Sequence, residues 1–347
     1  MKSTFLGNDC IYLLKDLTGI MNFTPFSEKE KNISNGINYS EMITAEEPIS
    51  SEINQIFRGL LESKAEELAR YIGIISEQIY LRSRDKSIIV SLARAGSPIG
   101  ALIKRYFKFK YNIDIPHYSI SIIRDRGIDK NALDYIREVH PNGIITFVDG
   151  WTGKGSITSE LKKSVHEYNQ ETGSEISYDL AVLADPARLS SIAGTRKDIC
   201  IPNACLNSTI SGLVSRTILN HQYISEKDFH GAVRYDYLKA FDVTNLFLDT
   251  IESKFIKDCN GYEDRGKSCV DVITARLKSD FPIANINKVK LSIGESSRAL
   301  LRRIPYIILV KNINNPDLSF ILHLAKIKGV EVKEYDTMDY ECITLLR

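Results

Sequence analysis

Residues 144–156 combine residue types that suit phosphate binding. An apolar run over residues 144–148 predicts a buried strand, and Asp149 follows it at the edge where parallel sheets of open α/β folds bind ligands. Glycines in the next turn let backbone N–H groups approach an anion, and a following helix adds the positive end of its dipole. A lysine ammonium and two hydroxyl groups supply further donors. The predicted phosphate-binding loop contains Gly150, Trp151, Thr152, Gly153, Lys154, Gly155 and Ser156.

This loop differs from the P-loop of ATP- and GTP-binding proteins. A P-loop requires Gly-x-x-x-x-Gly-Lys followed by Ser or Thr. Here Gly155 follows Lys154, and no glycine stands five residues before Gly153. An ordinary strand-to-helix turn is the alternative interpretation of these residues.

Two further polar loops follow predicted strands. The loop at residues 91–98 precedes a helix that begins at a proline, so it can present N–H groups and a guanidinium to a diphosphate. The loop at residues 123–129 contains paired arginines. A surface ion pair for the first loop and a solvated loop for the second are the alternatives. The residues that we expect to contact a ligand are Arg94, Ala95, Gly96 and Ser97 in the first loop and Arg124 and Arg126 in the second.

Alternating strand-like and helix-like segments position these loops. Apolar residues recur at helical intervals over residues 51–82, which predicts one long helix or two. Strands are then expected at 88–92, 117–123, 144–148 and 180–184, with helices at 98–108, 130–139 and 155–170. Because this order implies crossover helices, we predict an α/β protein with a parallel sheet flanked by helices.

A smaller α/β domain is expected after a linker at residues 282–287. Strands are predicted at 289–293, 307–310, 330–333 and 342–346, with helices at 296–303 and 316–328. The chain has 347 residues, which exceeds the usual domain size of about 100–200 residues. We therefore predict two domains, at residues 1–281 and 288–347.

Composition narrows the class of protein. Lysine plus arginine (45) nearly balances aspartate plus glutamate (44), so any basic binding surface must be local. The six cysteines are scattered without a Cys-x-x-Cys pair, which favours a reduced compartment. No signal peptide is recognisable, and no segment approaches the roughly 18 apolar residues of a membrane span. We therefore expect a cytoplasmic protein with no membrane contact, and homo-oligomer formation stays open.

The three loops resemble those of type I phosphoribosyltransferases. More closely, residues 91–100, 117–129 and 147–158, and Ile-Pro-Asn-Ala-Cys-Leu-Asn-Ser-Thr-Ile-Ser-Gly at 201–212, resemble the predicted phosphoribosyltransferases of tellurite-resistance gene clusters. That family is also labelled StiP-type cysteine protease. The resemblance covers nearly the first 280 residues. Residues 294–303 resemble the Pelota-like RNA-binding module found in the same family.

The resemblance implies a stress-response enzyme that uses 5-phosphoribosyl-1-diphosphate and Mg²⁺. A base or base-like acceptor would replace diphosphate at the anomeric carbon, with catalysis by positioning and by stabilisation of the leaving group. Asp149 would hold the ribose hydroxyls beside the metal, and residues 153–156 would bind the 5-phosphate. Gly150 stands where the family usually has a second acid, so turnover is in question.

The other roles follow from the same resemblance. Arg94, Ala95 and Gly96 would bind the diphosphate with its metal. Arg124 and Arg126 would close over the leaving group as a lid. The acceptor side is expected at Asp185, Asn203, Cys205 and Asn207.

Two other functions remain open. Cys205 is a candidate nucleophile of a cysteine hydrolase, with His221 or His230 as base, whereas a small buried cysteine is the alternative. A basic face on the helix at 296–303 predicts RNA binding, with a solvated helix face as the alternative. This basic face, together with Gly150 in place of a second acid, favours a non-catalytic RNA-binding protein that senses a nucleotide. The basic residues are Arg298, Arg302 and Arg303.

Overall fold

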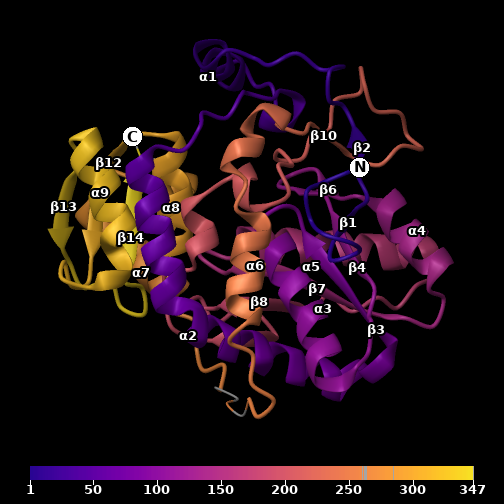
Figure 1. Cartoon of the computed structure of the whole chain (residues 1–347). Coiled ribbons are helices and arrows are strands. Elements are labelled where there is room, and N and C mark those ends of the chain that lie inside the picture. The colour runs from indigo at the N-terminus through magenta and orange to yellow at the C-terminus, as the bar shows by residue number, and fades with distance from the viewer. Residues whose placement is uncertain (260, 262–263, 284, 347) are drawn as a thin grey trace.

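A six-stranded parallel sheet organises most of the chain. The computed structural model describes residues 1–259, 261, 264–283 and 285–346 (Figure 1). The strand order is β1-β4-β3-β7-β8-β9, and every neighbouring pair is parallel. The strands are β1 (Ile11–Tyr12), β3 (Ser87–Leu92), β4 (His117–Ile120), β7 (Ile144–Trp151), β8 (Leu180–Ala184) and β9 (Ile192–Thr195). The predicted α/β class is confirmed.

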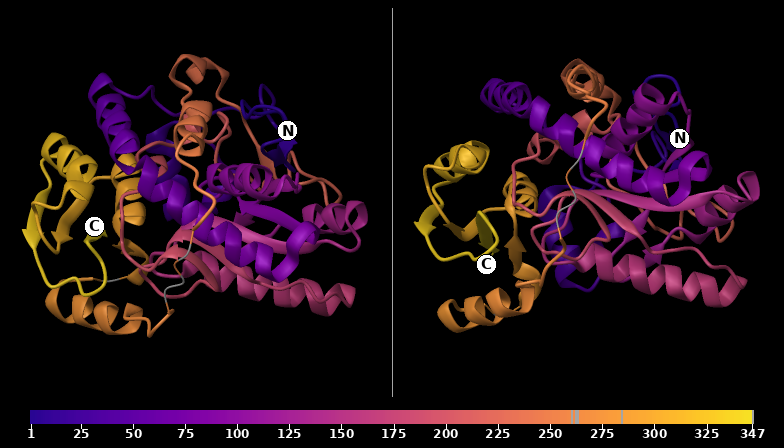
Figure 2. Two further views of the ribbon diagram at one scale, coloured as in Figure 1. Left: turned by 60° about the horizontal axis from the view of Figure 1, so that its bottom comes forward. Right: turned by 90° about the horizontal axis from the view of Figure 1, so that it is seen from below.

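Helices cover both faces of this sheet, as Figure 2 shows. One face packs against α2 (Ser51–Ser83), α3 (Ser97–Tyr111) and α6 (Thr244–Glu252). The other face packs against α4 (Lys130–Val139) and α5 (Ser156–Thr172). The apolar periodicity over residues 51–82 forms one helix, which begins where the Ser50 hydroxyl accepts a hydrogen bond from the Ile53 N–H.

Alternation along the strands builds two separate cores. All six residues of β3 are buried. Ile89 packs into the core with α2 and α3, whereas Val90 packs into the core with α4 and α5. Successive side chains of a strand point to opposite faces, so a run of apolar residues is required where helices cover both.

Short elements complete the first part of the chain. The segment predicted as one strand over 117–123 is interrupted at Ser121, so β4 is followed by a separate two-residue strand. That strand pairs with the next one in an antiparallel hairpin that carries Arg124 and Arg126 at its turn. The short elements are β2 (Lys15–Asp16), α1 (Phe26–Ser34), β5 (Ile122–Ile123), β6 (Gly127–Ile128) and β10 (Gly231–Ala232).

The C-terminal part is a smaller α/β domain, as predicted, and its sheet is mixed. Its strand order is β11-β14-β12-β13, with β14 antiparallel to both neighbours. The strands are β11 (Val289–Leu291), β12 (Pro305–Val310), β13 (Glu331–Glu334) and β14 (Cys342–Leu346). The helices are α7 (Val270–Asp280), α8 (Ile293–Arg302) and α9 (Ser319–Lys328).

The two faces of this smaller sheet have different partners. Ile273 and Leu277 of α7 pack with β11, β12 and β14. Leu300 of α8 and Phe320 of α9 share the core of the first sheet. The domain boundaries 1–281 and 288–347 stay a prediction, and residue 284 of the predicted linker lies outside the described residues.

Strand order places a crevice between two loops of interest. After β3 the chain adds β4 on one side, and β7 then returns to pair with the other side of β3. The loops after β3 and β7 therefore leave the sheet in opposite directions, and such a switch point opens a ligand crevice in α/β sheets. In the described part of the chain, no helix has the length and apolarity to cross a membrane.

Candidate functional site

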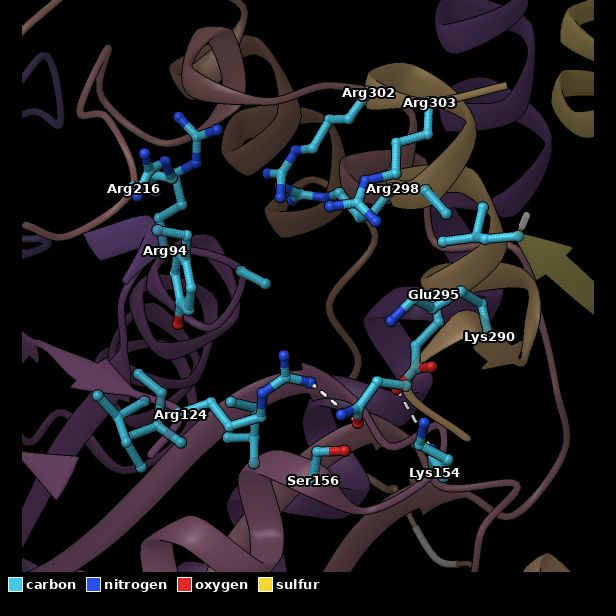
Figure 3. A pocket seen from close by; sticks show the side chains of 18 of the residues that line it. Arg94, Arg124, Lys154, Ser156, Arg216, Lys290, Glu295, Arg298, Arg302 and Arg303 are labelled. Atoms are coloured by element: carbon cyan, nitrogen blue, oxygen red, sulfur yellow. Dashed lines mark hydrogen bonds between the residues drawn. The ribbon is translucent and has the colours of Figure 1, made fainter. Parts of the chain in front are cut away.

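A cavity of about 680 Å³ lies at the carboxyl ends of β3 and β7, where α8 provides a further wall (Figure 3). Its volume falls within the range of about 300–1,000 Å³ that is typical of small-molecule sites. Among the described residues, the carboxylates on its wall are Asp149 and Glu295. The cationic side chains on the wall are Lys29, Arg94, Arg124, Lys154, Arg216, Lys288, Lys290, Arg298, Arg302 and Arg303. Because positive charges outnumber negative ones on the wall, the cavity favours a ligand with several negative charges.

Four of these arginines approach one another, and we call them the guanidinium cluster. They are Arg94, Arg216, Arg298 and Arg302. The positive charge of Arg94 acts on the other three, and that of Arg302 acts on Arg298. Figure 3 shows the first two on one side of the cavity and the α8 pair on another. The cluster therefore combines arginines of the sheet domain with arginines of the C-terminal domain.

Arg94 is fixed by partners on its own side of the cavity. It follows β3 and is buried. Its Nη1 donates to the carbonyl of Val214 (2.8 Å), and its Nη2 donates to Oε1 of Glu46 (2.5 Å). Glu46 also accepts from the N–H and hydroxyl of Ser208 (2.9 and 2.6 Å). The guanidinium is thus held in one orientation before any ligand binds.

Two asparagines orient the α8 arginines. Arg298 Nη2 donates to the carbonyl of Asn203 (3.1 Å), and its guanidinium lies 5.6 Å from the Trp151 ring centroid. The Asn207 side-chain oxygen accepts from Arg298 Nη1 (3.4 Å) and from Arg302 Nη2 (3.1 Å). Asn203 and Asn207, predicted on the acceptor side, therefore position cations at the cavity.

The arginines of the guanidinium cluster repel one another electrostatically. Burial first, and then the charges of Arg94 and Arg302, lower the pKa of Arg298. Burial and Arg94 likewise lower the pKa of Arg302. In the part of the chain that the structure describes, the buried Nε of Arg94, Nε of Arg298 and Nη1 of Arg216 find no hydrogen-bond partner. Unpaired buried donors are unfavourable, so an anion that accepts from them gains affinity.

Asp149 lies on the cavity wall within β7. Burial is the main cause that raises its pKa to about 7, against the opposing effects of the Gly150 N–H and the charge of Arg298. The Gly150 N–H donates to Asp149 Oδ1 (2.8 Å). The described residues contain no group of three potential metal-ligating side chains. Since Asp149 is a single carboxylate among arginines, these residues do not form a cage for a resident Mg²⁺.

The loop predicted to bind phosphate contacts the C-terminal domain instead. The Lys154 N–H donates to Glu295 Oε1 (3.2 Å), and the Lys154 ammonium donates to the carbonyl of Ile286 (2.5 Å). The Tyr340 hydroxyl donates to the Gly153 carbonyl (2.9 Å). A Cβ at position 153 would lie 2.3 Å from Cδ of Glu295. The glycine is therefore needed for close approach of a protein carboxylate, and this carboxylate takes the place expected for a phosphate.

Other residues of the two glycine-containing loops serve packing. A Cβ at Gly96 would lie 2.2 Å from the Val148 carbonyl, so the loop after β3 packs directly on β7. Ser97 is buried and its hydroxyl hydrogen-bonds that of Ser119 (2.8 Å). Gly155 has φ +88°, a left-handed conformation that favours glycine ahead of α5. The predicted ligand residues on the cavity wall are Arg94, Ala95, Arg124, Asp149, Trp151, Lys154 and Ser156, and those off it are Gly96, Ser97, Arg126, Gly150, Thr152, Gly153 and Gly155.

Asp185 is a structural anchor. Its side chain is fully buried and forms an ion pair with Arg196. It accepts hydrogen bonds from the N–H groups of Leu189 (3.0 Å) and Ser190 (3.1 Å) and from the Thr152 hydroxyl. With both oxygens occupied by these partners, the carboxylate fixes the loop after β8 and holds Thr152.

The paired arginines of the 123–129 loop have different surroundings. Arg124 lines the cavity and its Nη1 donates to Asn287 Oδ1 (3.4 Å). Arg126 instead forms an ion pair with Glu41 (2.6 Å). The hairpin turn thus directs one of the two predicted lid residues to the cavity.

Cys205 lies behind the cavity wall. It is fully buried in the main core, and burial together with the neighbouring Cys200 raises its pKa well above the ordinary value. Arg298 acts in the opposite direction but does not reverse the shift. In the described residues, no hydrogen bond joins Cys205 to His221 or His230. The described cavity wall itself contains neither cysteine nor histidine.

Sequence reasoning missed several residues at the site. Arg216 and Lys290 on the cavity wall have no motif around them, and neither has Glu46, which pairs with Arg94. Long-range folding brings all three to their positions. Glu295 had a local signal, since Ser292 and Glu295 have the spacing of a capping box. The Ser292 hydroxyl accepts from the Glu295 N–H (3.3 Å). That signal predicts a helix start, but not the contact with Lys154.

Comparison with known proteins shows the family. Residues 3–252 match the family model described as tellurite-like stress resistance cysteine protease StiP. Residues 269–347 match the PELOTA RNA binding domain. A protein of Acinetobacter baylyi (strain ATCC 33305 / BD413 / ADP1) described as cysteine protease StiP is 32% identical, over 93% of this chain and 89% of its own length.

These matches correct the expected reaction. The prediction of a phosphoribosyltransferase that uses 5-phosphoribosyl-1-diphosphate is wrong, because the family model and the relative are both described as a cysteine protease, a hydrolase. The type I phosphoribosyltransferase assignment of the sheet is likewise not confirmed. The predicted family resemblance itself is confirmed in both parts of the chain. The chain belongs to the StiP family of tellurite-like stress resistance proteins and carries a Pelota-type RNA-binding domain at its C-terminal end.

Proposed function

We propose that this protein binds RNA in the arginine-lined cavity, with α8 as one wall of the site. The guanidinium cluster carries the proposal, because it combines arginines of the C-terminal domain with arginines of the sheet domain. The match of residues 269–347 to an RNA-binding domain supports the same class of ligand.

The chemistry of the wall fits a phosphate backbone. Guanidinium groups bind phosphate oxygens through paired N–H donors, and they keep their charge at neutral pH. The whole chain has a formal net charge of only +1, so attraction to RNA must come from this local surface. Binding is therefore expected to weaken steeply with salt, as counterions are released from each contacted phosphate.

Removal of the α8 arginines tests the proposal. Arg298→Gln and Arg302→Gln are each expected to weaken binding of a short single-stranded RNA about tenfold, since a charge-assisted hydrogen bond contributes about 1.5–3 kcal/mol. The double variant should also reduce the salt slope by about 0.7 for each phosphate that is no longer neutralised. Fluorescence anisotropy with a labelled oligomer over a salt series measures both quantities.

Arg276→Gln is the matched control. Arg276 lies on α7 and pairs with Asp336 at the surface (2.8 Å), and it is not among the residues that line the cavity. This control should keep the affinity within about twofold. An unchanged affinity and salt slope in the double variant, or no RNA binding by the wild-type chain, would overturn the proposal.

Cysteine hydrolysis is a second candidate function. The family description and the relative from Acinetobacter baylyi favour it. Cys205 is the nucleophile to test, because it is next to the wall and Arg298 acts on its thiol. A reactive cysteine needs access and a lowered pKa, whereas this thiol is buried with a raised pKa. Hydrolysis would therefore require a rearrangement that exposes Cys205 to substrate and to a base.

Thiol reactivity distinguishes an inert from a catalytic Cys205. All six cysteines are buried, so we expect native protein to react slowly with iodoacetamide and fast only after unfolding. Cys205→Ser should then leave any peptidase activity on labelled casein unchanged, as should the neighbouring control Cys200→Ser. Rapid alkylation of native Cys205, with activity lost in Cys205→Ser but kept in Cys200→Ser, would contradict the expectation and assign the hydrolase.

A further inference from the structure

The guanidinium cluster has more charge than its neighbours neutralise. Arg94, Arg216, Arg298 and Arg302 contribute four positive charges. The carboxylates that act on these arginines include Glu46, which pairs with Arg94, and Asp149 beside Arg298. The cluster therefore favours a ligand group with more than one negative charge.

The arrangement of the donors also restricts the ligand. Arg94 and Arg216 lie on one side of the upper cavity, and the α8 arginines approach from another (Figure 3). An internal phosphodiester has one negative charge and two oxygens bonded to sugars, so it presents few free acceptors. A terminal phosphomonoester has about −1.5 to −2 charge at pH 7 and three free oxygens. The latter offers more acceptors to arginines that lie on two sides of the cavity.

We propose that the cavity recognises the phosphorylated end of an RNA strand, with the terminal phosphate bound by the guanidinium cluster. This inference rests on the proposed RNA binding and specifies the part of the RNA that enters. Arg124 lies in the lower part of the cavity in Figure 3 and Lys290 lies beside Glu295, so these two cations would face the next backbone phosphate. The cavity has the size of sites that enclose small ligands, so it takes an end rather than a long strand.

The test compares RNA ends on the wild-type full-length chain. Short oligomers of one sequence with an internal fluorophore have a 5′-phosphate, a 3′-phosphate or hydroxyls at both ends. A fourth oligomer, one nucleotide longer with hydroxyl ends, has the same number of phosphates as the phosphorylated ones. One phosphorylated end is expected to bind about tenfold tighter than both hydroxyl-ended oligomers. Whichever phosphorylated oligomer binds more tightly identifies the RNA end that the protein binds.

Two variants connect the preference to the cluster. Arg216→Gln should reduce the preference to less than about threefold, because an unpaired donor of the cluster is removed. Arg303→Gln, which lines the cavity outside the cluster, should weaken all oligomers alike and keep the preference. Equal affinity of the wild-type chain for all ends would overturn this inference while RNA binding itself stands. Absence of binding to every oligomer would overturn RNA binding as well.

Discussion

Replacement of Arg196 by methionine is expected to lower the free energy of unfolding by about 3–5 kcal/mol. The Arg196 guanidinium pairs with Asp185, whose side chain is fully buried at the end of β8. Methionine keeps much of the side-chain volume but leaves the carboxylate charged and buried with hydrogen bonds as its only compensation. Because Thr152 donates to the same carboxylate, the loop after β7 should loosen too. Urea denaturation at neutral pH measures the decrease.

An exposed ion pair provides the comparison for Arg196. Arg234 pairs with Asp236, which is 56% exposed, so Arg234→Met should cost less than about 1 kcal/mol. Adding Asp185→Asn to Arg196→Met should restore part of the stability, because the buried charge is then removed. A decrease below about 1 kcal/mol in Arg196→Met alone would mean that water reaches Asp185.

The four central strands of the parallel sheet could be predicted because each has a strong local signal, whereas the short edge strands β1 and β9 were not predicted. Residues 180–184 form an unbroken apolar run and are β8, and residues 130–139 form α4, where Asp129 caps the first turn through the Ala132 N–H. Burial of β3 on both faces is likewise visible as an apolar run. Local physics therefore determines these elements before tertiary contacts form.

The loop of residues 150–156 shows where local reasoning stops. Glycines and a lysine permit close approach of an anion, but they do not say whether a ligand or the protein supplies it. The carboxylate of Glu295 does so from 141 residues further along the chain than Lys154. Such a contact depends on how two domains pack, and one segment contains no information about that. Gly150 and Trp151 extend β7 instead of belonging to the loop, and the turn that remains leads into α5 as predicted, but its partner differs from the predicted one.

The cavity was accessible to sequence reasoning only in part. Arg94 follows β3 and Asp149 lies near the end of β7, so their meeting at one edge of the parallel sheet is a consequence of topology. Arg124 lines the same cavity from the turn of the β5–β6 hairpin. Arg216 and Glu46 lie in irregular segments without such a rule. The reaction was beyond reach for a different reason, since similar loops support different chemistries and function belongs to the assembled site.

Asp149→Asn is expected to make the protein more stable at neutral and alkaline pH, with little change near pH 4. The folded-state pKa of Asp149 is raised from 3.8 to about 7, chiefly by burial. A raised pKa means that the folded state favours the proton, so the wild-type chain loses stability as pH rises from about 4 to about 7. Since asparagine imitates the neutral acid, the variant avoids this loss. Because the side chain is half-buried, we discount the full shift to about 2 kcal/mol at pH 8.

Urea unfolding of both proteins between about pH 4 and pH 8 measures this difference. Asp125→Asn is the control, because that side chain is 79% exposed in the neighbouring loop and its replacement should change stability little. A stability gain for Asp149→Asn that is constant with pH would contradict a titrating Asp149.

RNA affinity extends the same argument to the proposed function. Ionised Asp149 opposes the charge of Arg298, so Asp149→Asn should tighten RNA binding about threefold at pH 8 and hardly at pH 6. Burial lowers the pKa of Lys154 to about 8, and its loss of charge weakens binding in the same pH range. The weakening of RNA binding that comes from deprotonation of Lys154 should remain in Asp149→Asn and disappear in Lys154→Met. A pH dependence of affinity that neither variant changes would place the titrating group outside this cavity.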